Sequence, residues 1–312
     1  MSILEIKKIL EKSFISVKKN PKFWFLGFFL IFFINHEIDI VISILNQITI
    51  YLTRLINNIK VPVIFQSKEI SNIFILVHNS FQKINLPNIF ILITIALSLY
   101  LVFMAQIIII SLAKDFNKSS SKSKVPFNEI FIKSHKFLGP TIIIYLLLGG
   151  IIFIFLNIPL LFKGYLNSNA LPSWTIVSYI VIILLLSLIF IFIAKFSLFF
   201  VIIKKEKLFT SIKKSAKFFF ENWFSIIKIS LSLSVVTMLF GLMIFLIFLG
   251  TLIPVSFLLR LSLQLMSPSL YLAFITGLTF IISVISIIIL SFFSYFQFLV
   301  WPLYFLKSVE KM

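Results

Sequence analysis

Long apolar runs alternate with short polar segments along most of the chain. A helix needs about 20 mostly apolar residues to cross a bilayer. Five runs reach that length, namely 89–113, 141–162, 174–203, 224–250 and 270–301. A sixth run, 23–34, is shorter, and it crosses if Lys22 extends toward the headgroups and the helix continues past His36. The pattern predicts an all-α, polytopic transmembrane helix bundle with about six spans.

The composition agrees with a membrane protein. Of the 312 residues, 60% are hydrophobic and 12% are charged, whereas soluble domains carry about 25% charged residues. So few polar residues cannot cover the surface that a soluble fold of this size exposes to water. We therefore expect residues 1–312 to form a single integral membrane domain.

Basic residues fall unevenly on the two sides of the predicted bundle. The side that holds both termini carries 20 lysines, against six Lys and Arg on the other side. The positive-inside rule then predicts a cytoplasmic membrane location with both termini in the cytoplasm. The net charge of +18 also suits nucleic acid. The lysines lie in short blocks between apolar runs, however, so we favour anionic membrane lipids as partners and expect no nucleic acid.

A basic amphipathic segment precedes each of spans one, three and five. The three segments are LEKSFISVKKNPKFWF (10–25), IKSHKFLGPTIII (132–144) and IKKSAKFFFENWFSII (212–227). Their Lys-Ser pairs align, and a turn into the membrane is expected at Asn20-Pro21, Gly139-Pro140 and Asn222. We interpret them as interfacial helices that lead three repeat units, 1–113, 127–203 and 207–312. The alternative is that any multi-pass protein places lysines beside its spans.

The third segment shows the amphipathic pattern in detail. One stripe holds Leu208, Phe209, Ile212, Ala216, Phe219 and Trp223, and the opposite side holds Lys213, Lys214, Lys217 and Glu221. A helix lying in the interface places its apolar side in the lipid and its lysines at the headgroups. The predicted headgroup-binding residues across the three segments are Lys12, Lys133, Lys213, Lys214 and Lys217.

Two connections between the spans are unusual. The segment 36–87 is long yet rich in Ile and Leu, and the spacing predicts outer amphipathic helices near 44–59 and 70–81. The alternative is a re-entrant segment at 38–56. The Ser/Lys-rich segment 114–126 is expected to be a flexible linker.

One part of the sequence, residues 194–231, resembles a known family. Residues 194–231 (AKFSLFFVIIKKEKLFTSIKKSAKFFFENWFSIIKISL) are similar to the membrane domain associated with glycerophosphodiester phosphodiesterases and to its stand-alone relatives. The family pattern is matched by Lys195, Glu206 and Lys214-Ser215, and 18–30 resembles the start of such domains. The family position matched by Lys195 is usually Arg, and no phosphodiesterase domain follows before Met312. The resemblance implies a membrane module without hydrolase activity.

Few residues suggest chemistry. The chain has no cysteine, which excludes thiolate nucleophiles and thiolate metal sites. His36, Glu37 and Asp39 form the one compact cluster of acid, base or metal-binding types, but polar residues are also needed where span one leaves the membrane. His78 and His135 have no obvious partner in the sequence. We predict no catalytic, cofactor-binding or metal residue.

Lys195 is the main intramembrane candidate, because a charge inside a bilayer is costly and is usually functional. One interpretation is an anchor that extends to the inner headgroups, and the other is a buried lysine that lines a cavity. Gly149-Gly150 and Gly241 suggest close helix packing rather than ligand binding.

The leading hypothesis is a non-enzymatic membrane module that binds lipid or scaffolds a membrane-protein partner. The alternative is a transporter or permease subunit with a pathway near Lys195. A third hypothesis, a lipid enzyme, requires His36, Glu37 and Asp39 to converge with other polar groups.

Overall fold

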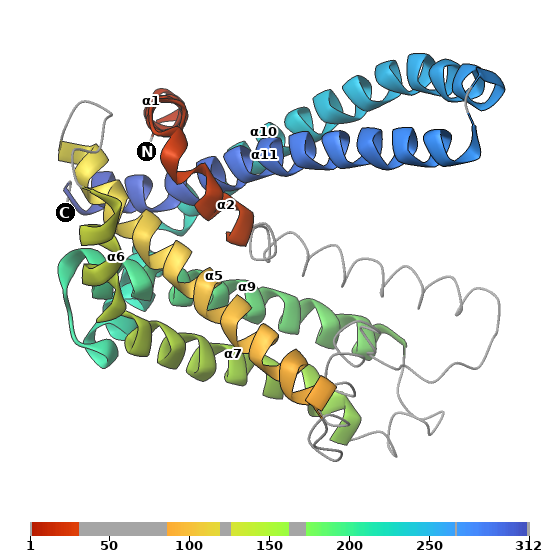
Figure 1. Cartoon of the computed structure of the whole chain (residues 1–312). Helices are drawn as coiled ribbons and strands as arrows, with labels where there is room; N and C mark the ends of the chain where they lie inside the picture. The colour runs from red at the N-terminus through yellow and green to blue at the C-terminus, as the bar shows by residue number, and fades with distance from the viewer. Residues whose placement is uncertain (1, 31–85, 119–125, 162–172, 266, 311–312) are drawn as a thin grey trace. The chain divides into compact units, whose positions relative to one another are not determined.

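The computed structural model describes residues 2–30, 86–118, 126–161, 173–265 and 267–310 (Figure 1). Over these ranges the chain forms eight α-helices and one short 3-10 helix, with no strand, which confirms the all-α prediction for them. The elements are α1 (Ile3–Lys19), η1 (Pro21–Phe23), α2 (Trp24–Leu30), α5 (Leu86–Lys118), α6 (Phe127–His135), α7 (Leu138–Leu161), α9 (Ser173–Lys204), α10 (Leu208–Leu265) and α11 (Pro268–Val309).

Several helices have the length and apolarity of membrane spans. Among the described residues there are four: Phe90–Asn117, Val181–Lys204, Leu208–Leu246 and Ser269–Val309. A fifth results if α6 and Leu138–Ile151, which meet at a bend of 55°, count as one broken span. The predicted spans 89–113, 174–203, 224–250 and 270–301 therefore lie within α5, α9, α10 and α11, and α10 extends about 15 residues beyond its predicted span at each end.

Other predicted segments lie wholly or partly outside the described residues. Of the short first span, 24–30 is helical as α2, and 31–34 is not described. The expected outer helices near 44–59 and 70–81, the re-entrant alternative at 38–56, the His36 cluster and His78 also fall outside. Residues 114–118 of the expected linker 114–126 are helical instead, because α5 continues to Lys118, and 119–125 are not described.

The chain divides into two compact units. Unit 1 comprises Met1–Ile31, Leu112–Lys124 and Phe220–Met312, and unit 2 comprises Phe32–Ser111 and Val125–Phe219. The boundaries fall inside α5 and inside α10.

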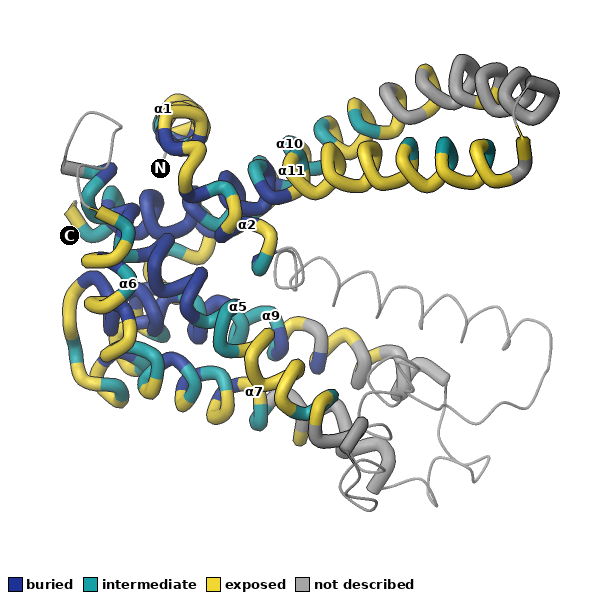
Figure 2. The backbone as a smooth tube through the Cα atoms, viewed as in Figure 1, coloured by how far each residue is buried: buried dark blue, intermediate teal, exposed yellow. Residues whose placement is uncertain are grey.

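Unit 1 is built on the C-terminal half of α11. Helix α2 packs along it through Leu26, Gly27 and Leu30, and α1 also contacts it. Tyr295 and Leu299 of α11 are fully buried in this region. Figure 2 shows the change along α11, from a buried C-terminal half to an exposed N-terminal half. Exposed apolar residues such as Leu270, Phe280 and Ile285 are the surface that a helix presents when lipid is its solvent.

Close backbone packing in unit 1 occurs at Gly27, which sequence reasoning did not select. A Cβ built on Gly27 would lie 1.8 Å from the Ser291 carbonyl oxygen. The predicted packing glycines differ, because a Cβ at Gly149, Gly150 or Gly241 meets no described atom within 4 Å. The prediction of close packing at those three positions is therefore wrong for the part of the chain that the structure describes.

Unit 2 joins α5, α6, α7 and α9 with the first turns of α10. Helices α7 and α9 pack against each other. The hydroxyl of Tyr145 on α7 donates to Gln106 Oε1 on α5 at 2.8 Å, and its ring stacks on Phe103. Gln106 is only 1% exposed, so this hydrogen bond satisfies a polar group inside an apolar packing surface.

Two of the three predicted turns are present. Helix α1 ends at Lys19, and the indole of Trp24 donates across the turn to Val17 O at 2.8 Å. The second break lies between α6 and α7, at Lys136 and Phe137 rather than at Gly139-Pro140. Pro140 has no N–H to offer the carbonyl of Lys136, four residues earlier, so a helix breaks there.

The third predicted turn is absent. Helix α10 runs without a break from Leu208 to Leu265 and passes through Asn222. The prediction of a separate interfacial helix before span five is therefore wrong, because Asn222 is followed by no proline or glycine that would interrupt the helical hydrogen bonds. The break lies earlier, in the turn between α9 and α10.

Candidate functional site: the basic turn between α9 and α10

The turn between α9 and α10 contains four charged residues in sequence, Lys204 to Lys207. Lys205 adopts a left-handed conformation with φ of 58°, and the Glu206 N–H donates to Phe200 O at 3.2 Å. A left-handed residue just after the last helical residue is a common helix-end motif, and that position usually carries glycine. The motif leaves Lys204, Lys205 and Lys207 exposed.

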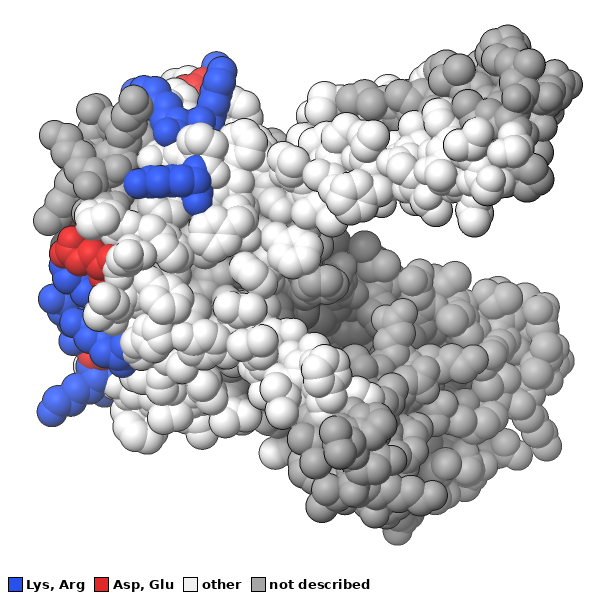
Figure 3. Space-filling model, viewed as in Figure 1, with Lys and Arg blue, Asp and Glu red and all other residues white. Residues whose placement is uncertain are grey.

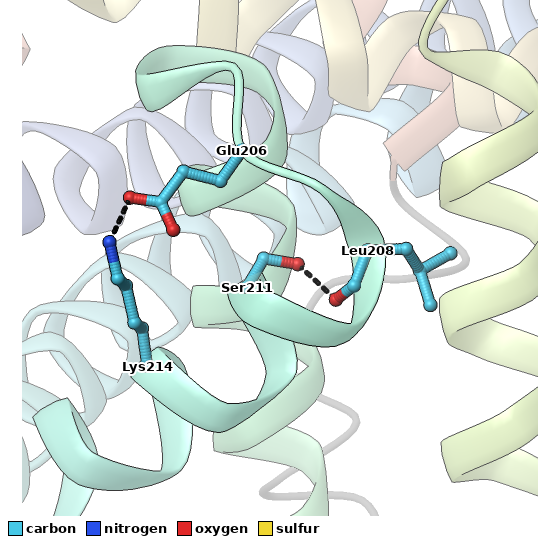
Figure 4. Close-up of polar contacts among 4 residues, drawn as sticks. All are labelled: Glu206, Leu208, Ser211 and Lys214. Atoms are coloured by element: carbon cyan, nitrogen blue, oxygen red, sulfur yellow. Dashed lines mark hydrogen bonds and ion pairs between the residues drawn. The ribbon is translucent and has the colours of Figure 1, made fainter.

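Glu206 connects the turn to α10 (Figure 4). Its Oε1 accepts from Lys214 Nζ at 2.7 Å. The Glu206 side chain is 19% exposed, against 51% for Lys214, and its Oε2 is buried with no hydrogen-bond partner among the described residues. In the first turn of α10 the Ser211 hydroxyl donates to Leu208 O at 2.6 Å. Glu206 therefore depends on Lys214 for the compensation of its charge.

Ser215 follows Lys214 and faces the interior of unit 2. It is 0% exposed, and its hydroxyl lies 2.7 Å from that of Ser197 on α9, which is also 0% exposed. The sequence positions that carry the family resemblance thus come together in part: Glu206 pairs with Lys214, and Ser215 packs on α9.

Lys195 lies two residues before Ser197 on α9. Its exposure is intermediate, whereas the adjacent Ala194 and Phe196 are buried. The ammonium lies 5.7 Å from the centroid of the Phe192 ring. The anchor and the cavity-lining interpretations of Lys195 both stay predictions.

The exposed side of this part of α10 carries the other predicted lysines. Lys213 and Lys217 are exposed, and Phe209, four residues before Lys213, is 80% exposed. The face that packs against protein holds instead Ser211, Ser215 and Phe218. Of the predicted apolar stripe, which was expected to face lipid, Phe209 and Trp223 are exposed, whereas Phe219 stacks on Phe192 of α9 with ring centroids 5.8 Å apart.

The side chain of Lys12 on α1 interacts with residues at the C-terminal ends of α5 and α11 in unit 1. Its ammonium donates to Asn117 Oδ1 at 3.1 Å and to Asn117 O at 3.3 Å, near the C-terminus of α5. Asn117 Nδ2 donates in turn to Glu310 Oε1 at 2.8 Å. Burial lowers the pKa of Lys12 below 10.5, while Glu310 acts to raise it and Lys307 acts to lower it.

Lys133, on α6, forms an ion pair with Glu129 one turn earlier. Each of Lys12, Lys133 and Lys214 is followed by a buried serine: Ser13, Ser134 and Ser215 are 0%, 1% and 0% exposed. Sequence reasoning aligned these Lys-Ser pairs but did not assign the serines to the packing face. The sequence could have indicated this assignment, because small hydroxyl residues are enriched on helix packing surfaces in membranes.

His135 has a partner, contrary to the prediction. Its Nε2 lies 2.6 Å from the Tyr100 hydroxyl on α5, and its Nδ1 lies 3.1 Å from Phe131 O. Among the described residues no group of three or more His, Cys, Asp or Glu could hold a metal ion.

No family model matches the chain, and neither the curated proteins nor the solved structures give a match. The fold itself defines a class, a helical protein with several candidate membrane spans. The family resemblance stays an expectation.

Proposed function

We propose that the protein is a non-enzymatic, multi-pass module of the cytoplasmic membrane that binds anionic lipid headgroups on its cytoplasmic side. The proposal includes six spans, both termini in the cytoplasm, and kinship with the stand-alone membrane domains that the sequence resembles. The single observation that carries it is the exposed lysine group at the α9–α10 turn and the first turns of α10, Lys204, Lys205, Lys207, Lys213 and Lys217.

The position of this group relative to the apolar helix surfaces supports the proposal. Helix α9 ends at Lys204 after a long apolar run, so the lysines begin where the candidate span Val181–Lys204 stops. Each lysine near an anionic bilayer surface contributes about 1 kcal/mol of electrostatic attraction. Several lysines at a span end therefore favour anionic headgroups over zwitterionic ones.

Unit 1 also carries exposed lysines, on the amphipathic helix α1. Lys7, Lys8, Lys18 and Lys19 are exposed on α1, and Figure 3 shows blue side chains over this helix. The described part of the outer α10–α11 hairpin is white in the same view. The Phe14 ring of α1 packs edge-on against Phe292 of α11, with ring centroids 5.7 Å apart, which sets α1 beside an apolar helix surface as an interfacial helix requires.

Lipid binding by the purified full-length protein tests the proposal. Delipidated protein is titrated with phosphatidylglycerol or phosphatidylcholine, and bound lipid is counted by native mass spectrometry. We expect tighter binding of phosphatidylglycerol, and a loss of that preference when Lys213, Lys214 and Lys217 are changed together to Gln. Equal binding of the two lipids by the wild-type protein would refute the proposed function.

A further inference from the structure

Lys228 is the last charged residue of α10 before a long uncharged run. It lies inside the candidate span Leu208–Leu246, and residues 229–259 contain no Lys, Arg, Asp or Glu. Its ammonium lies 4.3 Å from the centroid of the Phe224 ring, one turn earlier on the same helix. We infer that Lys228 and Phe224 form a site for one membrane phospholipid, in which the ammonium of Lys228 binds the lipid phosphate.

The position of Lys228 along α10 corresponds to the boundary between headgroups and acyl chains. Trp223 is 53% exposed, and an exposed tryptophan at a span end is typical of headgroup depth. With a rise of 1.5 Å per residue, the backbone of Lys228 lies about 7.5 Å further along the helix. Side chains on a helix lean toward its N-terminus, and the ammonium accordingly lies over Phe224. The charge therefore points back toward the depth of Trp223, where lipid phosphates lie.

The surface of α10 beside Lys228 is apolar and exposed. Phe224, Ile227 and Leu231 are 57%, 43% and 62% exposed, and their spacing of three and four residues places them along one stripe of the helix. Ile226, in contrast, is 0% exposed and packs inside unit 1. Where lipid is the solvent, an acyl chain covers such a stripe. A lipid whose phosphate contacts Lys228 can therefore lay an acyl chain along Ile227 and Leu231.

Charge complementarity selects the occupant of the site. In the described part of the chain, Lys228 forms no ion pair with a carboxylate, and its ammonium contacts the neutral ring of Phe224. A charge at membrane depth is costly unless an opposite charge compensates it. A phosphate supplies that charge and accepts strong hydrogen bonds from an ammonium. Because the apolar stripe adjoins the lysine, a phosphate with attached acyl chains fits better than a free phosphate.

This inference rests on the membrane location in the proposed function, but it does not depend on a preference for anionic lipids. The phosphate that Lys228 binds is common to anionic and zwitterionic phospholipids. Phosphatidylcholine carries no net charge, so its binding tests the Lys228 site separately from the headgroup preference of the proposed function.

Binding of phosphatidylcholine to the delipidated full-length protein is the test. Native mass spectrometry measures the affinity for the first bound lipid. Lys228→Gln is expected to weaken that affinity by about 10-fold or more, because a hydrogen bond between charged groups is lost. Lys228→Arg should keep it within about threefold, since a guanidinium also binds phosphate. Lys8→Gln is the matched control, because Lys8 is exposed on α1 of the same unit, and its affinity should stay within about twofold of the wild type.

Several results would overturn the inference. These are an unchanged affinity in Lys228→Gln, a loss in Lys228→Arg as large as in Lys228→Gln, and an equal loss in Lys8→Gln, which would show that general positive charge binds the lipid. Glycerol 3-phosphate has the phosphate without acyl chains, and its binding as tightly as phosphatidylcholine would overturn the phospholipid as occupant. A phosphatidylglycerol preference with no effect of Lys228→Gln would refute only this site. Lys228-dependent binding of phosphatidylcholine without that preference would refute only the headgroup selectivity of the proposed function.

Discussion

Gly27 of α2 lies directly against the backbone of Ser291 on α11. A Cβ at position 27 would come within 1.8 Å of the Ser291 carbonyl oxygen and 2.7 Å of its carbonyl carbon. Ser291 is itself small and 4% exposed. Small residues on both helices allow this approach, as in other membrane helix pairs, where van der Waals contact replaces the hydrophobic driving force.

Gly27→Ala is therefore expected to destabilise unit 1. The methyl group meets backbone atoms, which cannot rotate away as a side chain would, so α2 must shift from α11 at a cost of about 1–3 kcal/mol. The melting temperature of the purified protein measures the effect. Gly149→Ala is the matched control, since a Cβ there meets no described atom within 4 Å and alanine favours helix over glycine. Equal melting temperatures for Gly27→Ala and the wild type would contradict the close approach.

The helices themselves could be predicted from the sequence, but their packing faces could not. The spans of α5, α9, α10 and α11 follow from apolar length, because only about 20 continuous apolar residues satisfy a bilayer core. In water, apolar residues also mark the face that packs against protein. In a membrane, lipid and protein are equally apolar, so Phe209 is exposed while Ser215 is buried.

The breaks between helices could also be predicted only in part from the sequence. Asn20-Pro21 predicts a break and one is present, because proline removes a helical hydrogen bond. Asn222 has no such neighbour, and α10 passes through it. The candidate site was identified in part: Lys214 and Glu206 were both selected, but their ion pair depends on the left-handed Lys205, which no spacing rule indicates.

Replacing Lys205 by glycine is expected to stabilise the α9–α10 turn. A left-handed conformation costs an L-residue about 1–2 kcal/mol and costs glycine little, but glycine loses more backbone entropy on folding, so a net gain of about 0.5–1 kcal/mol is expected. The melting temperature should rise. Lys204→Gly, at the last residue of α9, removes the same charge from a helical position and should lower it. A lower melting temperature for Lys205→Gly would contradict the assigned turn geometry.

The neighbours of Lys12 should shift its pKa in opposite directions. Glu310 acts to raise the pKa of Lys12 and Lys307 acts to lower it. Glu310→Gln is therefore expected to lower the pKa of Lys12 further, and Lys307→Gln is expected to raise it. The pH dependence of amine acetylation at Lys12, followed by mass spectrometry, gives the pKa in each variant. Shifts of the same sign in both variants would contradict the arrangement.

The lowered pKa of Lys12 also determines how its contribution to stability changes with pH. Between the lowered folded value and the unfolded value of 10.5, the unfolded chain binds more protons at this position than the folded chain. The contribution of Lys12 to the free energy of unfolding therefore increases as the pH rises through that window. Lys12→Met should remove this part of the rise, which the pH dependence of the melting temperature of the two proteins measures.

The proposed orientation can be tested by single cysteines, because the chain has none of its own. Ser267 lies in the turn between α10 and α11 and is exposed, and Lys8 is exposed on α1. If both termini are cytoplasmic, Ser267→Cys should react with a membrane-impermeant maleimide in intact cells. Lys8→Cys should react only after the cells are made permeable, since the positive-inside rule places the lysine-rich α1 in the cytoplasm. Labelling of Lys8→Cys but not Ser267→Cys in intact cells would show the opposite orientation. The proposed topology has an odd number of crossings between residues 8 and 267, so labelling of both cysteines in intact cells would contradict it.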